Sequence, residues 1–212
     1  MTLDITFRPC KPDDVDLAVP LIYSSGPAAF DYVFSDQKEG ESLAFLRTAF
    51  VETSTAFSHR AHIAALLDGK VVGVGTMFLA DQHFSFTVGA IKAFLRFYRP
   101  MGVLRTIRRG LNIEKVIQPP KKGIGIIAHL GVAPEHRSKG IGEKLIDHLV
   151  DQLREKNIET AALDVAVTNP RAYALYKRIG FLDSVTRKSD LNSRFGHVVD
   201  HIYMEMPIEK RT

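Results

Sequence analysis

The sequence predicts a single mixed α/β domain over residues 1–212, with a central sheet of about seven strands and flanking helices. Three observations support this fold class. A hairpin signal stands at Asp68-Gly69, a strand, a helix and a second strand succeed one another between residues 123 and 167, and two further strand patterns lie near the C-terminus. The strand, helix, strand order is that of a right-handed parallel crossover.

The first quarter of the chain predicts one strand and two helices. Residues 3–8 alternate apolar and polar side chains, which is the period of a half-buried strand. Asp13 is placed to cap a helix whose apolar positions recur as far as Ile22. A second helix is expected from Glu41 to Glu52, because its apolar residues also recur at helical spacing.

Residues 62–78 predict an antiparallel hairpin. The segments 62–67 and 71–78 are largely apolar, and the dipeptide Asp68-Gly69 between them favours a tight turn because it tolerates positive φ.

The crossover comes next in the predicted sheet. The mostly apolar run 123–132 is typical of a strand that is buried on both faces. The helix that begins near Gly140 carries six apolar residues on one face, and Asn157 is a suitable C-terminal stop. A strand over 160–167 completes the crossover.

The C-terminal part predicts one short helix and two strands. Pro170 is well placed in the first turn of a helix that reaches Ile179 and ends at Gly180. The strands are expected over 181–187 and 197–206, with residues 188–196 as a polar linker.

Composition excludes several classes of protein. The single Cys10 cannot form an internal disulfide, and no His or Asp stands near it at the spacing of a metal ligand. No run approaches the roughly 18 apolar residues of a membrane span, and the first residues lack the apolar core of a secretory signal. A cytoplasmic protein without a metal is therefore expected.

Positive charge is concentrated in residues 81–122. This segment holds nine Lys and Arg residues against two acids, so it carries +7 of formal charge, whereas the whole chain carries +4 and the remainder therefore −3. We treat it as a basic helical insertion that is broken by Pro100-Met101-Gly102 and closed by Pro119-Pro120. Its apolar helix faces are expected at Ile91, Phe94, Leu95, Tyr98, Leu104, Ile107 and Leu111.

A glycine-containing loop leads from the strand that ends at Val132 into the helix that begins near Gly140. At such a junction, unpaired backbone N–H groups and the helix dipole favour an anion, and glycines let a phosphate approach the main chain. Arg137 and Lys139 add positive charge, and Ser138 adds a hydroxyl. The alternative is a solvated turn with an N-terminal helix cap.

Two motifs in this order resemble those of the GCN5-related N-acetyltransferase (GNAT) superfamily. Residues 137–142, Arg-Ser-Lys-Gly-Ile-Gly, are similar to motif A, in which Arg/Gln-x-x-Gly-x-Gly/Ala follows the fourth strand. Residues 169–181 are similar to motif B, Asn-x-x-Ala-x-x-x-Tyr-x-x-x-Gly-Phe. The resemblance extends over most of the chain but stops at 81–122. It implies a splayed pair of fourth and fifth strands, and acetyl-CoA as the donor.

The resemblance also implies which residues bind acetyl-CoA. Leu130 and Val132 would contact the pantetheine arm through the main chain, and Asn169 would hydrogen-bond the same arm, although it is also a suitable helix cap. The backbone N–H groups that would hold the pyrophosphate belong to Arg137, Ser138, Lys139, Gly140, Ile141, Gly142, Glu143 and Lys144.

Two candidate catalytic residues follow from the same comparison. Tyr176 matches the family tyrosine that donates to the leaving thiolate, and its alternative role is to pack its helix on the sheet. His129 in the fourth strand is a candidate base because imidazole titrates near neutral pH; a structural histidine is the alternative. Ile126 and Ala128, where relatives often carry acidic or imidazole groups, are apolar, so a water relay or a group from another segment stays open. A backbone N–H near Leu130 would stabilise the oxyanion.

We therefore expect an acetyl-CoA-dependent N-acetyltransferase that acts directly on a primary amine of a small molecule, a peptide or a protein. The missing acid in the fourth strand motivates one alternative, a non-catalytic acyl-CoA-binding sensor on the same fold. The insertion 81–122 motivates others: a lid or homodimer element, recognition of an acidic acceptor, or an acyltransferase docked on an anionic membrane surface. Nucleic acid ranks last, because the segment lacks aromatic residues spaced for base stacking.

Overall fold

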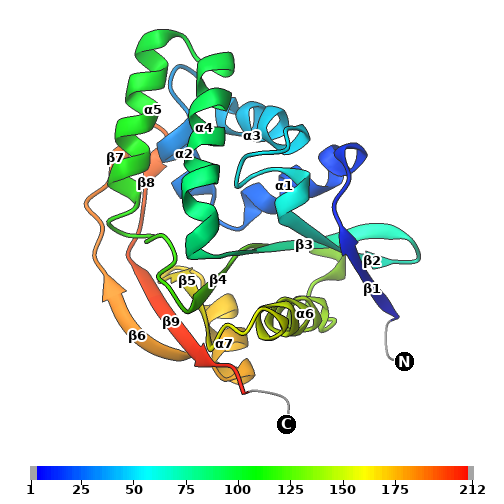
Figure 1. Cartoon of the computed structure of the whole chain (residues 1–212). Coiled ribbons are helices and arrows are strands. Elements are labelled where there is room, and N and C mark those ends of the chain that lie inside the picture. The colour runs from blue at the N-terminus through cyan, green and yellow to red at the C-terminus, as the bar shows by residue number, and fades with distance from the viewer. Residues whose placement is uncertain (1–3, 210–212) are drawn as a thin grey trace.

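The computed structural model describes residues 4–209, in which a mixed seven-stranded sheet is covered by helices on both faces (Figure 1). The sheet order is β1-β2-β3-β4-β5-β9-β6, and only β4 and β5 are parallel neighbours. The predicted fold class and crossover are therefore confirmed, while Leu3 of the predicted first strand lies outside the described residues.

The strands of the sheet are β1 (Ile5–Pro9), β2 (His62–Leu67), β3 (Lys70–Phe78), β4 (Ile124–Val132), β5 (Thr160–Ala166), β6 (Leu182–Arg187) and β9 (His201–Pro207). The α-helices are α1 (Val15–Ser24), α2 (Pro27–Phe34), α3 (Glu41–Val51), α4 (His83–Phe97), α5 (Pro100–Ile113), α6 (Ile141–Glu155) and α7 (Pro170–Ile179).

Helices α6 and α7 cover one face of the sheet, and helices α1 to α5 cover the other. On the first face, Leu145 and Leu149 of α6 are buried against strand residues such as Leu163. On the second face, a core that includes Phe45 of α3 packs on strand residues such as Val74. The apolar stripe of each helix thus faces the sheet, as its period predicts.

Strands β4 and β5 diverge in the middle of the sheet. They pair only from Ile124 to Ile126 of β4. Farther along, β4 shifts its register against β3 between Val74 and Thr76, and His129 adopts a left-handed backbone with a φ of 54°. A bulge of this kind bends a strand and leaves backbone groups without a ladder partner. The splayed strand pair implied by the resemblance is therefore confirmed.

Helix α2 is the one α-helix of the described chain that the sequence prediction omits. It begins at Pro27, and only two residues separate it from the end of α1 at Ser24. Its eight residues make about two turns, which is too short for a periodic pattern to stand out. Proline in the first turn was the available signal. The helix buries Phe30 and Phe34, both of which bear on the site below.

Two smaller expectations are wrong. The predicted linker forms a two-stranded ribbon of β7 (Asn192–Ser193) and β8 (Gly196–His197), so that β9 starts at His201. At the start of α1, the carboxylate of Asp14 instead of Asp13 accepts the backbone N–H of Lys11, at 2.7 Å. Asp14 is held there by an ion pair with Arg8.

The basic insertion forms the helix pair α4 and α5, which stand side by side next to α2 and α3 (Figure 1). Pro100 begins α5 instead of lying in a break, because its fixed φ suits the first helical turn. The buried faces pass through Phe94, Tyr98 and Val103. Three residues expected on the apolar faces, Leu95, Leu104 and Leu111, are more than 60% exposed.

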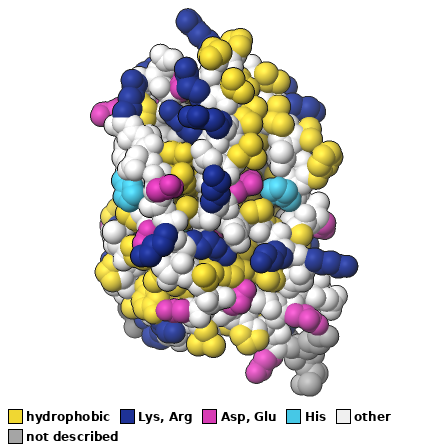
Figure 2. Space-filling view, turned by 90° about the vertical axis from the view of Figure 1, so that its left-hand side faces the viewer, with side chains coloured by type: hydrophobic (Ala, Val, Ile, Leu, Met, Phe, Trp, Pro, Cys, Tyr) yellow, Lys and Arg dark blue, Asp and Glu magenta, His cyan; other side chains and the backbone are white. Residues whose placement is uncertain are grey.

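Several arginines of the insertion attach it to the rest of the chain. Arg105 donates two hydrogen bonds to the buried carboxylate of Asp36, at 2.6 and 2.7 Å. Arg109 donates to the main-chain oxygen of Ser35, and Arg96 pairs with Glu52. Figure 2 shows Lys and Arg side chains mixed with acidic and apolar ones on this side of the molecule, not one continuous basic surface. Within residues 4–209, no helix is long and apolar enough to cross a membrane.

The packing of α4 is testable with a matched pair of glycines. A Cβ at the buried Gly89 would overlap the main-chain oxygen of Ser54, which no side-chain rotation relieves. Gly89→Ala should therefore lower the free energy of unfolding by about 2 kcal/mol or more. Nothing lies within 4 Å of a Cβ at Gly110 in α5, so Gly110→Ala should raise it by about 0.5–1 kcal/mol. Urea denaturation measures both, and equal effects of the two variants would contradict this packing.

Candidate active site

The loop before α6 has the geometry of an anion site. Ser138 and Gly140 both have left-handed backbones, with φ of 61° and 79°, and Gly140 stands immediately before the first helical residue. Lys144 donates the first backbone hydrogen bond of the helix, to Gly140. The N–H groups of the intervening residues therefore have no partner within the helix. The role of this loop as a pyrophosphate cradle stays a prediction.

Three arginines surround the loop. Arg137 donates from Nε to the main-chain oxygen of Val132, at 3.0 Å. Arg171 at the start of α7 donates to the Ser138 hydroxyl at 2.8 Å. Arg178 pairs with Glu143 of the first turn of α6 at 2.9 Å. This ion pair neutralises the negative charge of Glu143 at the helix N-terminus, where an anion is favoured. All three arginines line the cavity described next.

A single cavity of about 960 Å³ runs from this loop, past the divergence of β4 and β5, to helices α2, α4 and α5. That volume is in the range of small-molecule sites. The predicted residues that line it are His129, Leu130, Val132, Arg137, Ser138, Gly140, Ile141, Gly142, Glu143, Asn169 and Tyr176. The predicted Lys139 and Lys144 do not line it.

Asn169 and Tyr176 come to the cavity from α7. The Asn169 side chain accepts the backbone N–H of Ala172 at 3.1 Å, so its role as a helix cap is present while the residue also lines the cavity. Tyr176 is 9% exposed and packs edge-on against Phe181. Burial raises the pKa of Tyr176 to about 12, so its hydroxyl is protonated at neutral pH.

His129 takes part in a chain of two histidines. Its Nδ1 lies 3.0 Å from Nε2 of His62, whose own Nδ1 lies 2.9 Å from the main-chain oxygen of Ser58. Since Nδ1 of His62 must donate to that oxygen, its Nε2 accepts, and His129 donates from Nδ1. The Nε2 atom of His129 is then the acceptor. Burial and the neighbouring His62 lower the pKa of His129 well below the usual range, which makes it a weak base.

Aromatic rings hold His129 in place. The ring centroids of Phe30, Phe57 and Phe78 lie 5.6, 5.5 and 5.4 Å from that of His129. The histidine thus sits at the bulge of β4 in a largely apolar setting. Its role as base stays a prediction that this setting disfavours.

Asp164 of β5 is the residue of this site that the sequence prediction missed. Its side chain is 6% exposed, and it lines the cavity. One carboxylate oxygen accepts from Arg187 at 2.9 Å, while Oδ2 is buried without a hydrogen-bond partner in the described chain. Burial raises the pKa of Asp164 to about 7, although Arg187 opposes the shift. An acid in the otherwise apolar strand pattern of 160–167 was the available signal.

The partner of Asp164 is itself positioned by other side chains. Arg187 donates to Gln118 at 3.2 Å and lies 4.4 Å above the ring centroid of Tyr203. Within the described residues, no group of three His, Cys, Asp or Glu side chains could hold a metal ion. The charged groups that line the cavity are thus three arginines and Glu143 at the α6 end, Asp164 near the divergence of the strands, and Glu114 at the end of α5.

Comparison with known proteins shows the family of the chain. The profile of the Acetyltransferase (GNAT) family matches residues 30–181 of the chain, a span that includes both motifs, β4, β5 and the insertion. The chain belongs to this family. The family resemblance stated from the two motifs is therefore confirmed.

Curated relatives match a shorter part. The [ribosomal protein bS18]-alanine N-acetyltransferase of Salmonella typhimurium is 34% identical over 80 residues, which are 38% of this chain and 53% of the relative. The L-amino acid N-acyltransferase MnaT of Escherichia coli is 26% identical over 81 residues, 38% of this chain and 46% of the relative. The matches thus span about half the length of these curated relatives.

Solved structures share the fold over nearly the whole chain. An N-acetyltransferase from Staphylococcus aureus Mu50 has a TM-score of 0.68 and 16% identity, with 95% of this chain and 100% of that chain covered. The ribosomal-protein-S18-alanine N-acetyltransferase from Escherichia coli has a TM-score of 0.53 and 16% identity, with 99% and 97% covered.

The burial of His62 predicts how the free energy of unfolding depends on pH. Burial lowers the pKa of His62 to about 4, whereas a histidine in the unfolded chain titrates near 6.5. Between pH 4 and pH 6.5, His62 therefore binds more protons in the unfolded chain than in the folded one. The folded state loses stability as the pH falls from about 6.5 to about 4. His62→Gln should reduce this loss by up to about 1.4 kcal/mol per pH unit.

Urea denaturation at a series of pH values measures the effect. The exposed His197 provides a matched control as His197→Gln. Equal pH slopes for the wild type and His62→Gln would contradict a buried neutral His62.

Proposed function

We propose that the protein transfers the acetyl group of acetyl-CoA to a primary amine. One observation carries the proposal: a single cavity joins a cationic helix N-terminus to a buried carboxylate whose pKa lies near 7. The first feature suits the pyrophosphate of the donor, and the second suits removal of a proton from the acceptor.

The residues present fit acetyl-CoA. Gly142 lines the cavity and places no side chain between its backbone and a phosphate. The backbone N–H groups from Ser138 to Glu143 would hold the pyrophosphate, since those of Arg137 and Lys144 already donate to the main-chain oxygens of Pro134 and Gly140. Arg171 would add charge to it. Leu130, Val132 and Asn169 would hold the pantetheine arm. When bound, acetyl-CoA supplies the acyl group as a thioester.

Asp164 is the proposed base. An amine acceptor arrives as an ammonium ion and must lose a proton before its nitrogen can attack. A carboxyl group with a pKa near 7 is matched to that task at neutral pH, and its buried Oδ2 has no hydrogen-bond partner in the described chain. His129 is a weaker candidate because its lowered pKa gives it little affinity for a proton.

Two further groups complete the proposed mechanism. The Tyr176 hydroxyl, protonated because its pKa is raised, can donate a hydrogen bond to the leaving thiolate. The bulge at His129 and Leu130 interrupts the β3–β4 ladder, and β5 has already diverged there. A backbone N–H at this point is therefore suited to stabilise the oxyanion, as the sequence led us to expect.

The position of Asp164 bears on the alternative of a non-catalytic sensor. That alternative was motivated by apolar residues at Ile126 and Ala128 of the fourth strand. The neighbouring strand β5 supplies a carboxylate to the same cavity. The names of the relatives, an alanine and an amino-acid acyltransferase, also favour an amine acceptor.

The assignment of the base makes a prediction about pH. Asp164→Asn keeps an oxygen for Arg187 but cannot take a proton, so kcat/KM should fall about 10²- to 10⁴-fold. The wild-type kcat/KM should rise with pH up to a plateau above about 7, and the variant should lack this limb. Thiol release from acetyl-CoA measures both.

The control for this variant is Asp183→Asn, in an exposed ion pair with Lys177 outside the cavity. It should keep the wild-type pH profile. Calorimetric affinity of Asp164→Asn for CoA should also match the wild type. An Asp164→Asn enzyme with more than about a tenth of the wild-type kcat/KM would overturn the assignment.

The cradle is tested separately at Gly142. Gly142→Leu should weaken CoA binding at least about tenfold, because the side chain would occupy the space kept for the phosphates. Gly142→Ala is the graded comparison, since its Cβ would make only ordinary contacts. Calorimetry gives the affinities and urea denaturation checks the fold. Unchanged CoA affinity in a folded Gly142→Leu protein would contradict the donor site.

A further inference from the structure

The end of the cavity that lies away from α6 is an apolar arm. Helix α4 turns one stripe of residues to it, at spacings of three and four, and α5 adds another. The α4 residues that line the cavity are His83, Phe86, Thr87, Ala90, Ile91 and Phe94. The rings of Phe30 and Phe57 close the opposite wall. Helices α4 and α5 thus turn part of their apolar stripes toward the cavity, and no other segment within residues 4–209 covers this part.

Charge is segregated along the cavity. The Lys and Arg residues that line it, Arg137, Arg171 and Arg178, all belong to the α6 end. Arg105 and Arg109 of the insertion bond to Asp36 and Ser35 instead. In the described chain, the arm therefore has no Lys or Arg in its wall, so an acidic acceptor would find no fixed positive charge there.

Acids are present where the arm meets the reaction site. Asp164 and Glu114 line the cavity on this side. An ammonium group suits this junction, and an apolar substituent suits the space beyond it.

The arm and the proposed base lie on the same face of the sheet. Asp164 follows Ala162 by two residues in β5, so both side chains project from the same face. Ala162 packs in a cluster with Ile126 and Phe78, and the Phe78 ring contacts that of Phe86 on α4, at 5.8 Å. An amine whose nitrogen lies at Asp164 therefore extends its substituent toward α4.

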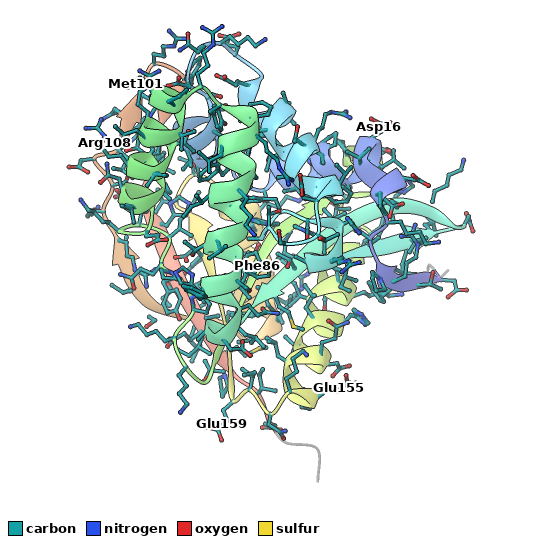
Figure 3. The ribbon with its side chains drawn as sticks, turned by 45° about the horizontal axis from the view of Figure 1, so that its top comes forward. Asp16, Phe86, Met101, Arg108, Glu155 and Glu159 are labelled. Atoms are coloured by element: carbon teal, nitrogen blue, oxygen red, sulfur yellow. The ribbon has the colours of Figure 1, made fainter. Side chains whose placement is uncertain are left out.

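The arm opens at the surface between α4 and α5. Ile91 and Leu111 line the cavity and are also 39% and 63% exposed. Figure 3 shows Phe86 at the end of α4 near the sheet, whereas Arg108 projects outward from α5. An elongated acceptor can thus enter without passing the arginines of the donor end.

We propose that the natural acceptor is a primary amine with an apolar body, an alkyl or aryl chain, which sits in the arm bounded by α2, α4 and α5. This inference rests on the proposed function and names the acceptor class of the same site. It disfavours the acidic acceptor that the basic insertion suggested from sequence. A longer acyl chain on the donor is the competing occupant of the arm. It is disfavoured because the carboxylate of Asp164, the proposed base for the amine, projects from the same face of the sheet as the arm.

The test compares amines of increasing length on the full chain with acetyl-CoA. Ethylamine, butylamine, hexylamine and octylamine are assayed by thiol release, beside spermidine and a peptide that begins with alanine. We expect kcat/KM to rise about threefold to fourfold per added methylene until the arm is filled. Calorimetry of octylamine with the CoA-bound protein gives a readout that does not depend on turnover.

Gly110→Leu adds a side chain from α5 to the wall of the arm, at a position where a Cβ has open space around it. It should reduce kcat/KM and affinity for octylamine at least tenfold, and move the optimum to a shorter amine. Arg108→Leu adds the same side chain on the same helix at an exposed position outside the cavity. It should leave the dependence of kcat/KM on amine length as it is in the wild type.

Several results would overturn the inference and leave acetyl transfer standing. These are equal kcat/KM along the alkyl series, a preference for spermidine or the peptide, or octanoyl-CoA with ethylamine outperforming acetyl-CoA with octylamine. Loss of CoA binding together with no turnover on any amine would instead overturn the proposed function. Octylamine binding that Gly110→Leu weakens would then still support the apolar arm.

Discussion

The divergence of β4 from β5 is the constraint on which the rest of the site depends. Two parallel strands that stayed paired beyond Ile126 would leave no space at the centre of the sheet. The bulge at His129 bends β4 away and accepts a left-handed residue to do so, a cost that local packing must offset. Stacking of His129 on His62 and its surrounding aromatic rings supplies that packing. The cavity, the loop before α6 and the carboxylate of β5 meet at this opening.

Electrostatics then divides the cavity into two ends. The N-terminus of α6 and its arginines suit a polyanion, whereas Asp164 stands in an environment that resists its charge. The same burial that raises the pKa of Asp164 also raises that of Tyr176, with opposite chemical consequences. A carboxyl group becomes able to hold a proton near neutral pH, and a phenol becomes less able to lose one.

The charged side and the apolar side of the insertion have different contacts. Its charged residues include Arg105 and Arg109, which hold it against the segment after α2. Its apolar stripe on α4 faces the cavity, so the helix pair supplies walls to that cavity and not one continuous basic surface. In the proposed function, a segment outside the two motifs thus forms the pocket for the acceptor.

The sequence by itself determined the fold class, most strands and helices, the loop that leads into α6 and the positions of Asn169 and Tyr176 on α7. These depend on local spacing: hydrophobic period, turn dipeptides and motifs in which every residue lies within one turn or helix. Only the tertiary structure decided that Asp164 faces Arg187, 23 residues away, with one oxygen free. It also decided which stripe of α4 lines a cavity, and it placed His129 against His62, 67 residues earlier. The pKa of a buried group is set by neighbours from distant segments, and a helix period shows that a face is apolar without showing whether protein or an open space covers it.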